Sequence, residues 1–379
     1  MTLKDQHIVI AGAGIIGLSA ALGFADAGAR VTVFESGRAM EQASWAAAGM
    51  LAVDDPENDL RLLPLSRLSR TLYPAFLRRV EELSGIAVPL RTSRTLQAAP
   101  HAADASTEAL PELLSSPFPD LLSRNWQFQE LEEASIDPRD LCAALPIAAR
   151  AVGVTLREYT AVYRALAAES DSGVRVEVRH AAVEEPSEGE GLEVCTADHF
   201  LLAAGAWSGQ VACGAANTPP VSPRKGQMLE VRLTEDAPRL SCVIRTPGLY
   251  LVPRGDGRVV IGATVESAGF DREIDPMAAE QLLRKAAALW PPILNSTVTA
   301  QWTGLRPGYS ESDDTLPLIG PLDAPSQAKP CIWAATGHFR NGILLAPATA
   351  RVLLAMLEGS TPPVSTADFA ASRFVEARC

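Results

Sequence analysis

Residues 7–35 read HIVIAGAGIIGLSAALGFADAGARVTVFE, and this stretch decides the fold. A run of β-forming residues (7–11) leads into a glycine-rich turn (12–17) and an alanine-rich helical pattern (18–27). Gly28 ends the predicted helix, and a second apolar run ends at Glu35. The order of strand, tight turn, helix and strand predicts a βαβ unit.

The glycines at 12, 14 and 17 have the spacing G-x-G-x-x-G, placed between a predicted strand and a predicted helix. Gly12 and Gly14 let the backbone turn tightly and approach a pyrophosphate, which the helix N-terminus stabilises. Gly17 lets the helix pack closely on the sheet. Glu35 can accept hydrogen bonds from both hydroxyls of a ribose. Because of this glutamate, the alternative that the glycines only pack a tight turn is the minor interpretation. The pattern predicts a dinucleotide site.

The glycine motif alone does not separate FAD from NAD. Glu35 stands where an arginine would be expected for a ribose 2′-phosphate, which disfavours NADP. The chain has a single such motif, whereas flavoproteins that also bind NAD(P)H commonly carry two. We therefore expect electrons to enter from the substrate itself.

The composition predicts a globular protein of two lobes, with 379 residues, 47% apolar and 21% charged. A net charge of -12 disfavours nucleic acid and anionic membrane surfaces as partners. The six cysteines are scattered without a C-x-x-C pair, so we expect reduced thiols in a cytoplasmic protein and no bound metal. From the residues that follow Met1 we expect no signal peptide, and we expect the most apolar early stretch to be too short for a membrane anchor.

Further along the chain, helices are predicted over 60–84, packed on the sheet and stopped by Gly85, and from Pro138 to about 151. Alternating segments near Thr155, 174–179 and 192–196 predict antiparallel strands, and 199–204 and 331–335 predict buried strands ending in glycine turns. Several short strands over 227–265 predict a second sheet inserted into the nucleotide fold, while 100–119 is interpreted as a surface excursion.

Three further motifs carry a family resemblance: AAAGML (46–51), WTGLRPG (302–308) and GHFRNGILLAP (337–347). Together they resemble the glycine oxidases of thiamine biosynthesis, which belong to the D-amino-acid oxidase superfamily. The likeness runs to about residue 351 and weakens across 100–129 and 182–191. It implies an α/β fold: a Rossmann-type FAD-binding domain (1–85, 135–215 and 300–379) interleaved with a mostly antiparallel β substrate domain (86–134 and 216–299) that roofs the flavin.

The same resemblance implies contacts to FAD from the turn, the end of the second strand, the alanine-rich loop and the last motif. These residues are Ile15, Ile16, Glu35, Ser36, Ala43, Ser44, Ala48, Gly49, Met50, Val162, His338, Phe339, Arg340, Asn341, Gly342, Ile343 and Leu344. The small residues over 46–49 let backbone approach a planar cofactor, although close loop packing would also explain them. Asn341 and Gly342 precede a predicted helix with Pro347 in its first turn, whose N-terminus can stabilise negative charge on a reduced flavin.

Substrate contacts are implied at Tyr250, Arg306 and Arg340. An amino acid presents a carboxylate, which a guanidinium binds with two parallel hydrogen bonds, and Arg306 is the natural donor. Taken alone, Arg306 would be interpreted as a surface arginine in a turn and Tyr250 as a half-buried strand tyrosine. Arg340 can serve the substrate, the flavin or both. We interpret His338 as a cofactor contact and expect no catalytic acid or base, because hydride transfer from a neutral amine needs none.

The implied activity is oxidation of glycine to glyoxylate, with ammonia and hydrogen peroxide as the other products and molecular oxygen as acceptor. Sarcosine or D-amino-acid oxidation, a dehydrogenase with another acceptor, and a flavin-binding subunit without turnover stay as alternatives. Sarcosine-oxidase relatives tether flavin through a cysteine after the motif arginine. Residues 307–310 contain none, so FAD is expected to be non-covalent. The family also implies a homotetramer. Ala52 replaces a family glycine near the expected pocket entrance.

Overall fold

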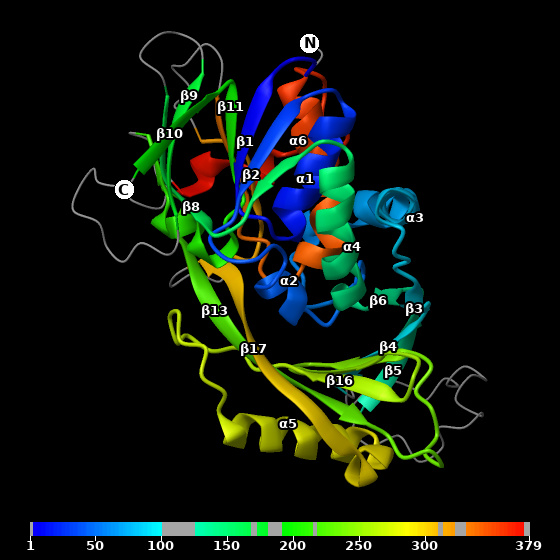
Figure 1. Cartoon of the computed structure of the whole chain (residues 1–379). Helices are drawn as coiled ribbons and strands as arrows, with labels where there is room; N and C mark the ends of the chain where they lie inside the picture. Colours follow the sequence, from blue (N-terminus) through cyan, green and yellow to red (C-terminus); the bar gives the residue numbers. More distant parts are fainter. Residues whose placement is uncertain are drawn as a thin grey trace.

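The structure is a computed structural model, and it describes residues 3–100, 126–167, 173–180, 192–214, 218–309, 314–322 and 331–374. The surface excursion expected over 100–119 lies almost entirely outside these residues. Two lobes are joined by two long strands, β13 (Val221–Arg232) and β17 (Thr297–Tyr309), which run from one lobe into the other (Figure 1). The N-terminal lobe contains the glycine motif, and the other lobe contains a large sheet.

The predicted βαβ unit is confirmed: β1 (His7–Ala11), α1 (Ile15–Asp26) and β2 (Arg30–Phe34), with the two strands parallel. Gly12 has a φ of 102°, in the left-handed region that favours glycine. A Cβ on Gly12 would lie 2.4 Å from the carbonyl oxygen of Ala203, so a larger residue would not fit this turn. The turn therefore brings backbone within reach of a ligand at the end of β1.

Six strands form the sheet of the N-terminal lobe, in the order β18-β19-β11-β1-β2-β7. The added strands are β7 (Thr155–Arg157), β11 (His199–Leu202), β18 (Leu318–Pro321) and β19 (Ile332–Thr336). The expectation of an antiparallel strand near Thr155 is wrong, because β7 pairs parallel with β2. The physical reason is that α4 (Pro138–Ala151) precedes β7 and packs on α1, as a helical crossover between parallel strands does.

Helices cover one face of this sheet (Figure 1). α1 packs against α6 (Gly342–Leu357), and α3 (Leu63–Ser84), preceded by the 3-10 turn η1 (Leu60–Leu62), ends at Gly85 as predicted. The main contacts of α3 are with α6 and α4, not with the sheet as we expected from the sequence, because α1 and α6 already occupy that face. The helix over 60–84 is thus confirmed and its packing partner corrected.

The other face is covered by a four-stranded sheet, in the order β10-β9-β8-β12. Its strands are β8 (Thr160–Ala167), β9 (Val174–His180), β10 (Leu192–Ala197) and β12 (Ala212–Cys213). β8, β9 and β10 are antiparallel, as predicted for 174–179 and 192–196. Val176 and Val178 of β9 share one buried cluster with Val9 and Phe200 of the first sheet.

The second lobe is a seven-stranded sheet, β17-β13-β16-β15-β14-β4-β5, with α5 (Pro276–Leu289) packed against it. The remaining strands are β4 (Thr95–Pro100), β5 (Trp126–Leu131), β14 (Val243–Thr246), β15 (Leu249–Pro253) and β16 (Arg258–Gly262). Only β4 and β14 are paired parallel among these described strands, so the predicted mostly antiparallel sheet is confirmed. β17 belongs to this sheet and crosses the boundary expected at residue 300. The domain boundaries stay a proposal.

Shorter elements connect these layers. They are α2 (Ala43–Ala46), β3 (Leu90–Thr92), β6 (Ser135–Ile136), and the 3-10 turns η3 (Gly205–Gln210), η4 (Pro291–Asn295), η5 (Ala367–Phe369) and η6 (Ala371–Phe374). No helix in the described ranges is long and apolar enough to cross a membrane.

Candidate functional site

Two adjoining hollows form one elongated crevice, and the second of them lies between the lobes. The first has a volume of about 380 Å³ and lies over the ends of β1 and β2; the second has a volume of about 230 Å³ and lies beside the N-terminus of α6. Residues from the glycine turn, α2 and the segment after β11 line both hollows: Gly14, Ala43, Ser44, Ala203 and Gly205. The carboxyl ends of parallel strands are the usual place for a dinucleotide, and the elongated shape suits one.

Glu35 lies at the rim of the first hollow, one residue after β2, and is buried. Its carboxylate accepts hydrogen bonds from the backbone N–H of Ala13 at 2.8 Å and of Gly37 at 3.0 Å. A carboxylate has about four acceptor positions, so these two bonds fix its orientation and leave lone pairs for a ribose hydroxyl. The hydroxyl of Ser36, 3.2 Å away, is the competing donor. The arrangement fits the ribose role predicted for Glu35.

The N-terminus of α1 points at the junction of the two hollows. Its N-cap residue, Gly14, has no side chain to accept from the first-turn amides, and the N–H of Ile15 donates to the hydroxyl of Ser44 at 2.9 Å. A helix N-terminus of this kind carries partial positive charge that favours a phosphate. The site therefore fits the pyrophosphate of a dinucleotide.

The predicted cofactor residues converge on this crevice with two exceptions. Gly17 lies beneath the turn, where a Cβ would stand 2.0 Å from the carbonyl oxygen of Gly12, so its role is close packing. Leu344 is buried in the helical core, and its carbonyl oxygen accepts from the hydroxyl of Ser69 at 2.5 Å. The others line the hollows: Gly12, Gly14, Ile15, Ile16, Glu35, Ser36, Ala43, Ser44, Ala48, Gly49, Met50, Val162, His338, Phe339, Arg340, Asn341, Gly342 and Ile343.

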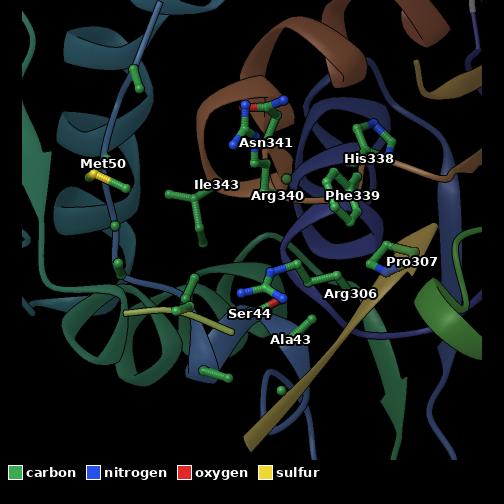
Figure 2. A pocket seen from close by; sticks show the side chains of 18 of the residues that line it. Ala43, Ser44, Met50, Arg306, Pro307, His338, Phe339, Arg340, Asn341 and Ile343 are labelled. Atoms are coloured by element: carbon green, nitrogen blue, oxygen red, sulfur yellow. The ribbon is translucent and has the colours of Figure 1, made fainter. Parts of the chain in front are cut away.

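Arg306 extends from β17 into the second hollow, toward the side where Met50 and Ile343 lie (Figure 2). Its guanidinium donates to the carbonyl oxygen of Thr264 at 3.1 Å and forms no ion pair with any acid in the described part of the chain. Burial lowers the pKa of Arg306, but a guanidinium still keeps its charge. A half-buried cation without an ion-pair partner among the described residues favours an anionic ligand.

Gly226 of β13 makes room for this guanidinium. A Cβ at Gly226 would lie 2.1 Å from Nη1 of Arg306, so the arginine can lie flat across β13 only above a glycine. The two strands pair with Arg224 opposite Arg306 and Gly226 opposite Gly304. The pairing of β13 and β17 therefore sets where the charge is presented.

Tyr250 of β15 lies next to Arg306 in the same hollow. Burial raises the pKa of its hydroxyl and the neighbouring Arg306 opposes the shift, so the phenol stays protonated at neutral pH. The hydroxyl donates to Sδ of Met228 at 3.0 Å, a weak acceptor that a carboxylate oxygen would readily replace. Arg306 and Tyr250 together can bind one carboxylate.

Arg340 also lines the second hollow, but its guanidinium already has acidic partners. It donates to Glu57 and lies 3.6 Å from a carboxylate oxygen of Asp55. A substrate carboxylate would have to compete with both acids for Arg340. Its assignment to substrate or flavin stays a prediction.

His338 is buried beside Thr349, with 3.1 Å between Nε2 and the threonine hydroxyl. Burial lowers the pKa of His338 to about 3, so the imidazole is neutral near pH 7. This agrees with the interpretation of His338 as a cofactor contact.

The predicted helix within the last motif is present but begins at Gly342, which was expected to precede it, and Pro347 lies inside it. The expectation that Pro347 belongs to the first turn is therefore wrong. The helix starts at Gly342, so Pro347 is its sixth residue and cannot donate to the carbonyl of Ile343. The hydroxyl of Tyr73 replaces that donor, at 2.6 Å.

Three charged residues of the second hollow were absent from the predicted site: Asp55, Glu57 and Arg245. Arg245 stands in the short apolar strand β14, and a lone charge in such a strand is a usable signal. Asp55 and Glu57 lie in a polar segment around Pro56, where charges are expected at the surface. Nothing in that local pattern indicates a cavity.

Comparison with known proteins places this geometry among flavoenzymes. Residues 7–356 match the DAO family, described as FAD dependent oxidoreductase. The chain is 32% identical to the glycine oxidase of Pseudomonas aeruginosa, over 97% of this chain and 98% of that protein. It is 31% identical to the bifunctional protein ThiO/ThiG of Trichormus variabilis, over 92% of this chain and 52% of that protein.

Among solved structures, the fold is similar to a crystal structure of glycine oxidase from Geobacillus kaustophilus. The TM-score is 0.83 and the sequence identity 28%, with 97% of this chain and 99% of that chain covered. The likeness extends through both lobes.

Proposed function

The chain belongs to the DAO family of FAD-dependent oxidoreductases, and from this premise we propose that it oxidises the amine of a small amino acid, with glycine as the first candidate. The observation that carries the proposal is the half-buried guanidinium of Arg306, which forms no ion pair in the described part of the chain and faces the second hollow. A substrate carboxylate supplies the missing negative charge.

The residues of the second hollow bind and orient the substrate. Arg306 and the hydroxyl of Tyr250 hold the carboxylate, which fixes where the α-carbon stands relative to α6 and the alanine-rich loop. The neutral imidazole of His338 neither adds charge nor takes up a proton at pH 7. Orientation by the carboxylate is the contribution that this chain's own side chains make to the reaction.

The chemistry that bound FAD supplies is acceptance of a hydride from the α-carbon and transfer of two electrons to molecular oxygen. Glycine, oxygen and water then give glyoxylate, ammonia and hydrogen peroxide. We expect FAD to be bound non-covalently, since residues 307–310 contain no cysteine. Release of flavin into the supernatant after acid precipitation would agree with this, whereas yellow precipitate would contradict it.

Glycine is preferred over the alternatives because two of the similar proteins are glycine oxidases, one related by sequence and one by structure. The similarity to ThiO/ThiG supports a role in supplying thiazole synthesis for thiamine. Sarcosine and small D-amino acids remain the alternative substrates, and a quinone or a partner protein the alternative acceptor. A homotetramer in the cytoplasm is proposed on the family resemblance.

A substrate panel with coupled peroxide detection tests the proposal. Purified protein in air should form peroxide with glycine faster than with sarcosine, D-alanine or L-alanine. Bleaching of the flavin by glycine without oxygen, combined with no peroxide in air, would indicate a different acceptor. No bleaching with any amino acid would contradict the proposed function.

A further inference from the structure

The second hollow contains two arginines besides Arg306, and one acid lies between them. A carboxylate oxygen of Asp55 is 3.9 Å from Nη1 of Arg245 and 3.6 Å from Nη2 of Arg340. Glu57 forms a second ion pair with Arg340, and Glu133 lies 3.1 Å from Nη2 of Arg245. Arg245 and Arg340 are therefore compensated by acids, while Arg306 forms no ion pair with any described residue.

Burial makes these charges strongly dependent on one another. The side chain of Asp55 is 7% exposed and that of Arg245 is 6% exposed. Removing Asp55 would leave Arg245 paired with Glu133 and Arg340 paired with Glu57, so each arginine would lose part of its compensation, which favours a ligand that restores the negative charge. Asp55 is the member shared by both arginines.

Arg245 also has N–H groups that are available to a ligand. Its Nε donates to Gln97, but Nη1 and Nη2 are buried and donate no hydrogen bond with good geometry in the described ranges. Asp55 and Arg245 both line the hollow. A second carboxylate on a substrate held at Arg306 would meet Arg245 and Arg340 as its attractive partners and Asp55 as its competitor.

We propose that Asp55 determines specificity: it occupies Arg245 and Arg340 and so restricts the site to substrates with a single carboxylate. The inference rests on the proposed function, because it assumes that Arg306 binds the first carboxylate. A dicarboxylate must either displace Asp55 from two arginines or stand beside its negative charge, and both are unfavourable. A monocarboxylate such as glycine avoids both.

The test compares Asp55→Asn with the parent, both loaded with FAD. Asparagine keeps the shape of the side chain and removes the charge. Binding of acetate and of malonate is measured from the change in flavin absorption, and kcat/KM is measured for glycine and iminodiacetate. We expect the malonate-to-acetate affinity ratio to rise about 10-fold or more in Asp55→Asn, with the iminodiacetate-to-glycine ratio of kcat/KM moving the same way.

Asp54→Asn is the matched control, because its side chain is 41% exposed, neighbours Asp55 and does not line the hollow. Both ratios should stay at the parent value in this variant. Unchanged ratios in Asp55→Asn would overturn the inference. A higher malonate ratio without oxidation of any amino acid would leave the inference standing and remove the proposed function.

If Asp55→Asn loses FAD, Glu57→Gln gives a second measurement. The side chain of Glu57 is 44% exposed and, among the described residues, forms an ion pair with Arg340 alone, so its removal leaves Arg340 paired only with Asp55 there and carries less risk to folding. The malonate-to-acetate ratio should then rise about threefold, in line with one partly exposed charge. No rise in this variant would also overturn the inference.

Discussion

The hydroxyl of Tyr73 donates a 2.6 Å hydrogen bond to the carbonyl oxygen of Ile343. Pro347, four residues after Ile343, has no N–H to donate to that carbonyl. Tyr73 thus completes the first turns of α6 from the neighbouring helix α3. Because Ile343 also lines the second hollow, the bond links the stability of α6 to the cofactor site.

Tyr73→Phe should lower the free energy of unfolding by about 1–3 kcal/mol, since it leaves a buried carbonyl without a donor. Urea denaturation with excess FAD measures this change. Tyr159→Phe is the control, because Tyr159 is 47% exposed and should change stability by less than about 0.5 kcal/mol. Equal stability of Tyr73→Phe and the parent would show that water or another group satisfies Ile343.

Glu35→Ala should weaken FAD binding by about 2–4 kcal/mol, because two charge-assisted hydrogen bonds to ribose are lost non-additively. The N–H groups of Ala13 in the glycine turn and of Gly37 in the loop after β2 also lose their acceptor. Glu35→Gln keeps one carbonyl oxygen and should lose less. Retention of FAD by Glu35→Ala during dialysis, at the parent level, would contradict the ribose role.

Gly226→Ala should displace Arg306 without unfolding the protein, because the new methyl group meets the far end of a flexible side chain. FAD should stay bound, while kcat/KM for glycine falls by about 10- to 100-fold through misplacement of the carboxylate anchor. Gly23→Ala in α1 is the control: beyond its own helical turns, no described atom lies within 4 Å of its added Cβ, so activity should be unchanged. Parent-like kinetics in Gly226→Ala would mean that Arg306 does not need its observed position.

The sequence predicted those parts of the fold and site that local chemistry determines. The turn at Gly12, the stop at Gly85 and the strand that ends just before Glu35 each depend on a few neighbouring residues. The direction of β7 could not be predicted in this way, because alternation of side chains does not specify which strand will be the partner. The contact of Asp55 with Arg245 and Arg340 likewise depends on three segments that meet only in the folded chain.

Protonation of His338 should make the protein less stable in acid. Its pKa is lowered to about 3 in the folded chain, against 6.5 when unfolded, so the unfolded state binds the extra proton between these values. The stability that the folded protein gains from keeping His338 neutral is complete above pH 6.5 and is lost as the pH falls toward 3. At pH 5 the loss should be about 2 kcal/mol. His338→Gln should show a correspondingly smaller difference in unfolding free energy between pH 7 and pH 5, and equal differences would contradict the assignment.

The last prediction concerns Arg306, whose guanidinium donates to the backbone carbonyl oxygens of Lys225 and Thr264 and forms no ion pair within the described part of the chain. Arg306→Ala should keep FAD and a near-normal visible spectrum, since the first hollow is untouched. Its kcat/KM for glycine should fall by about 10²-fold or more, equivalent to about 3 kcal/mol, because the carboxylate loses its charged partner. Steady-state peroxide assays measure the effect.

Arg306→Lys separates charge from shape. Lysine keeps the positive charge but lacks the planar pair of donors. Arg306→Lys should therefore recover only part of the activity and should misplace the substrate α-carbon relative to the flavin. Amines without a carboxylate supply the control, because any slow oxidation of them should be nearly indifferent to either substitution. If Arg306→Ala oxidised glycine with the parent kcat/KM, the carboxylate would have to be bound elsewhere in the hollow, and the proposal of an amino-acid substrate would lose its main chemical support.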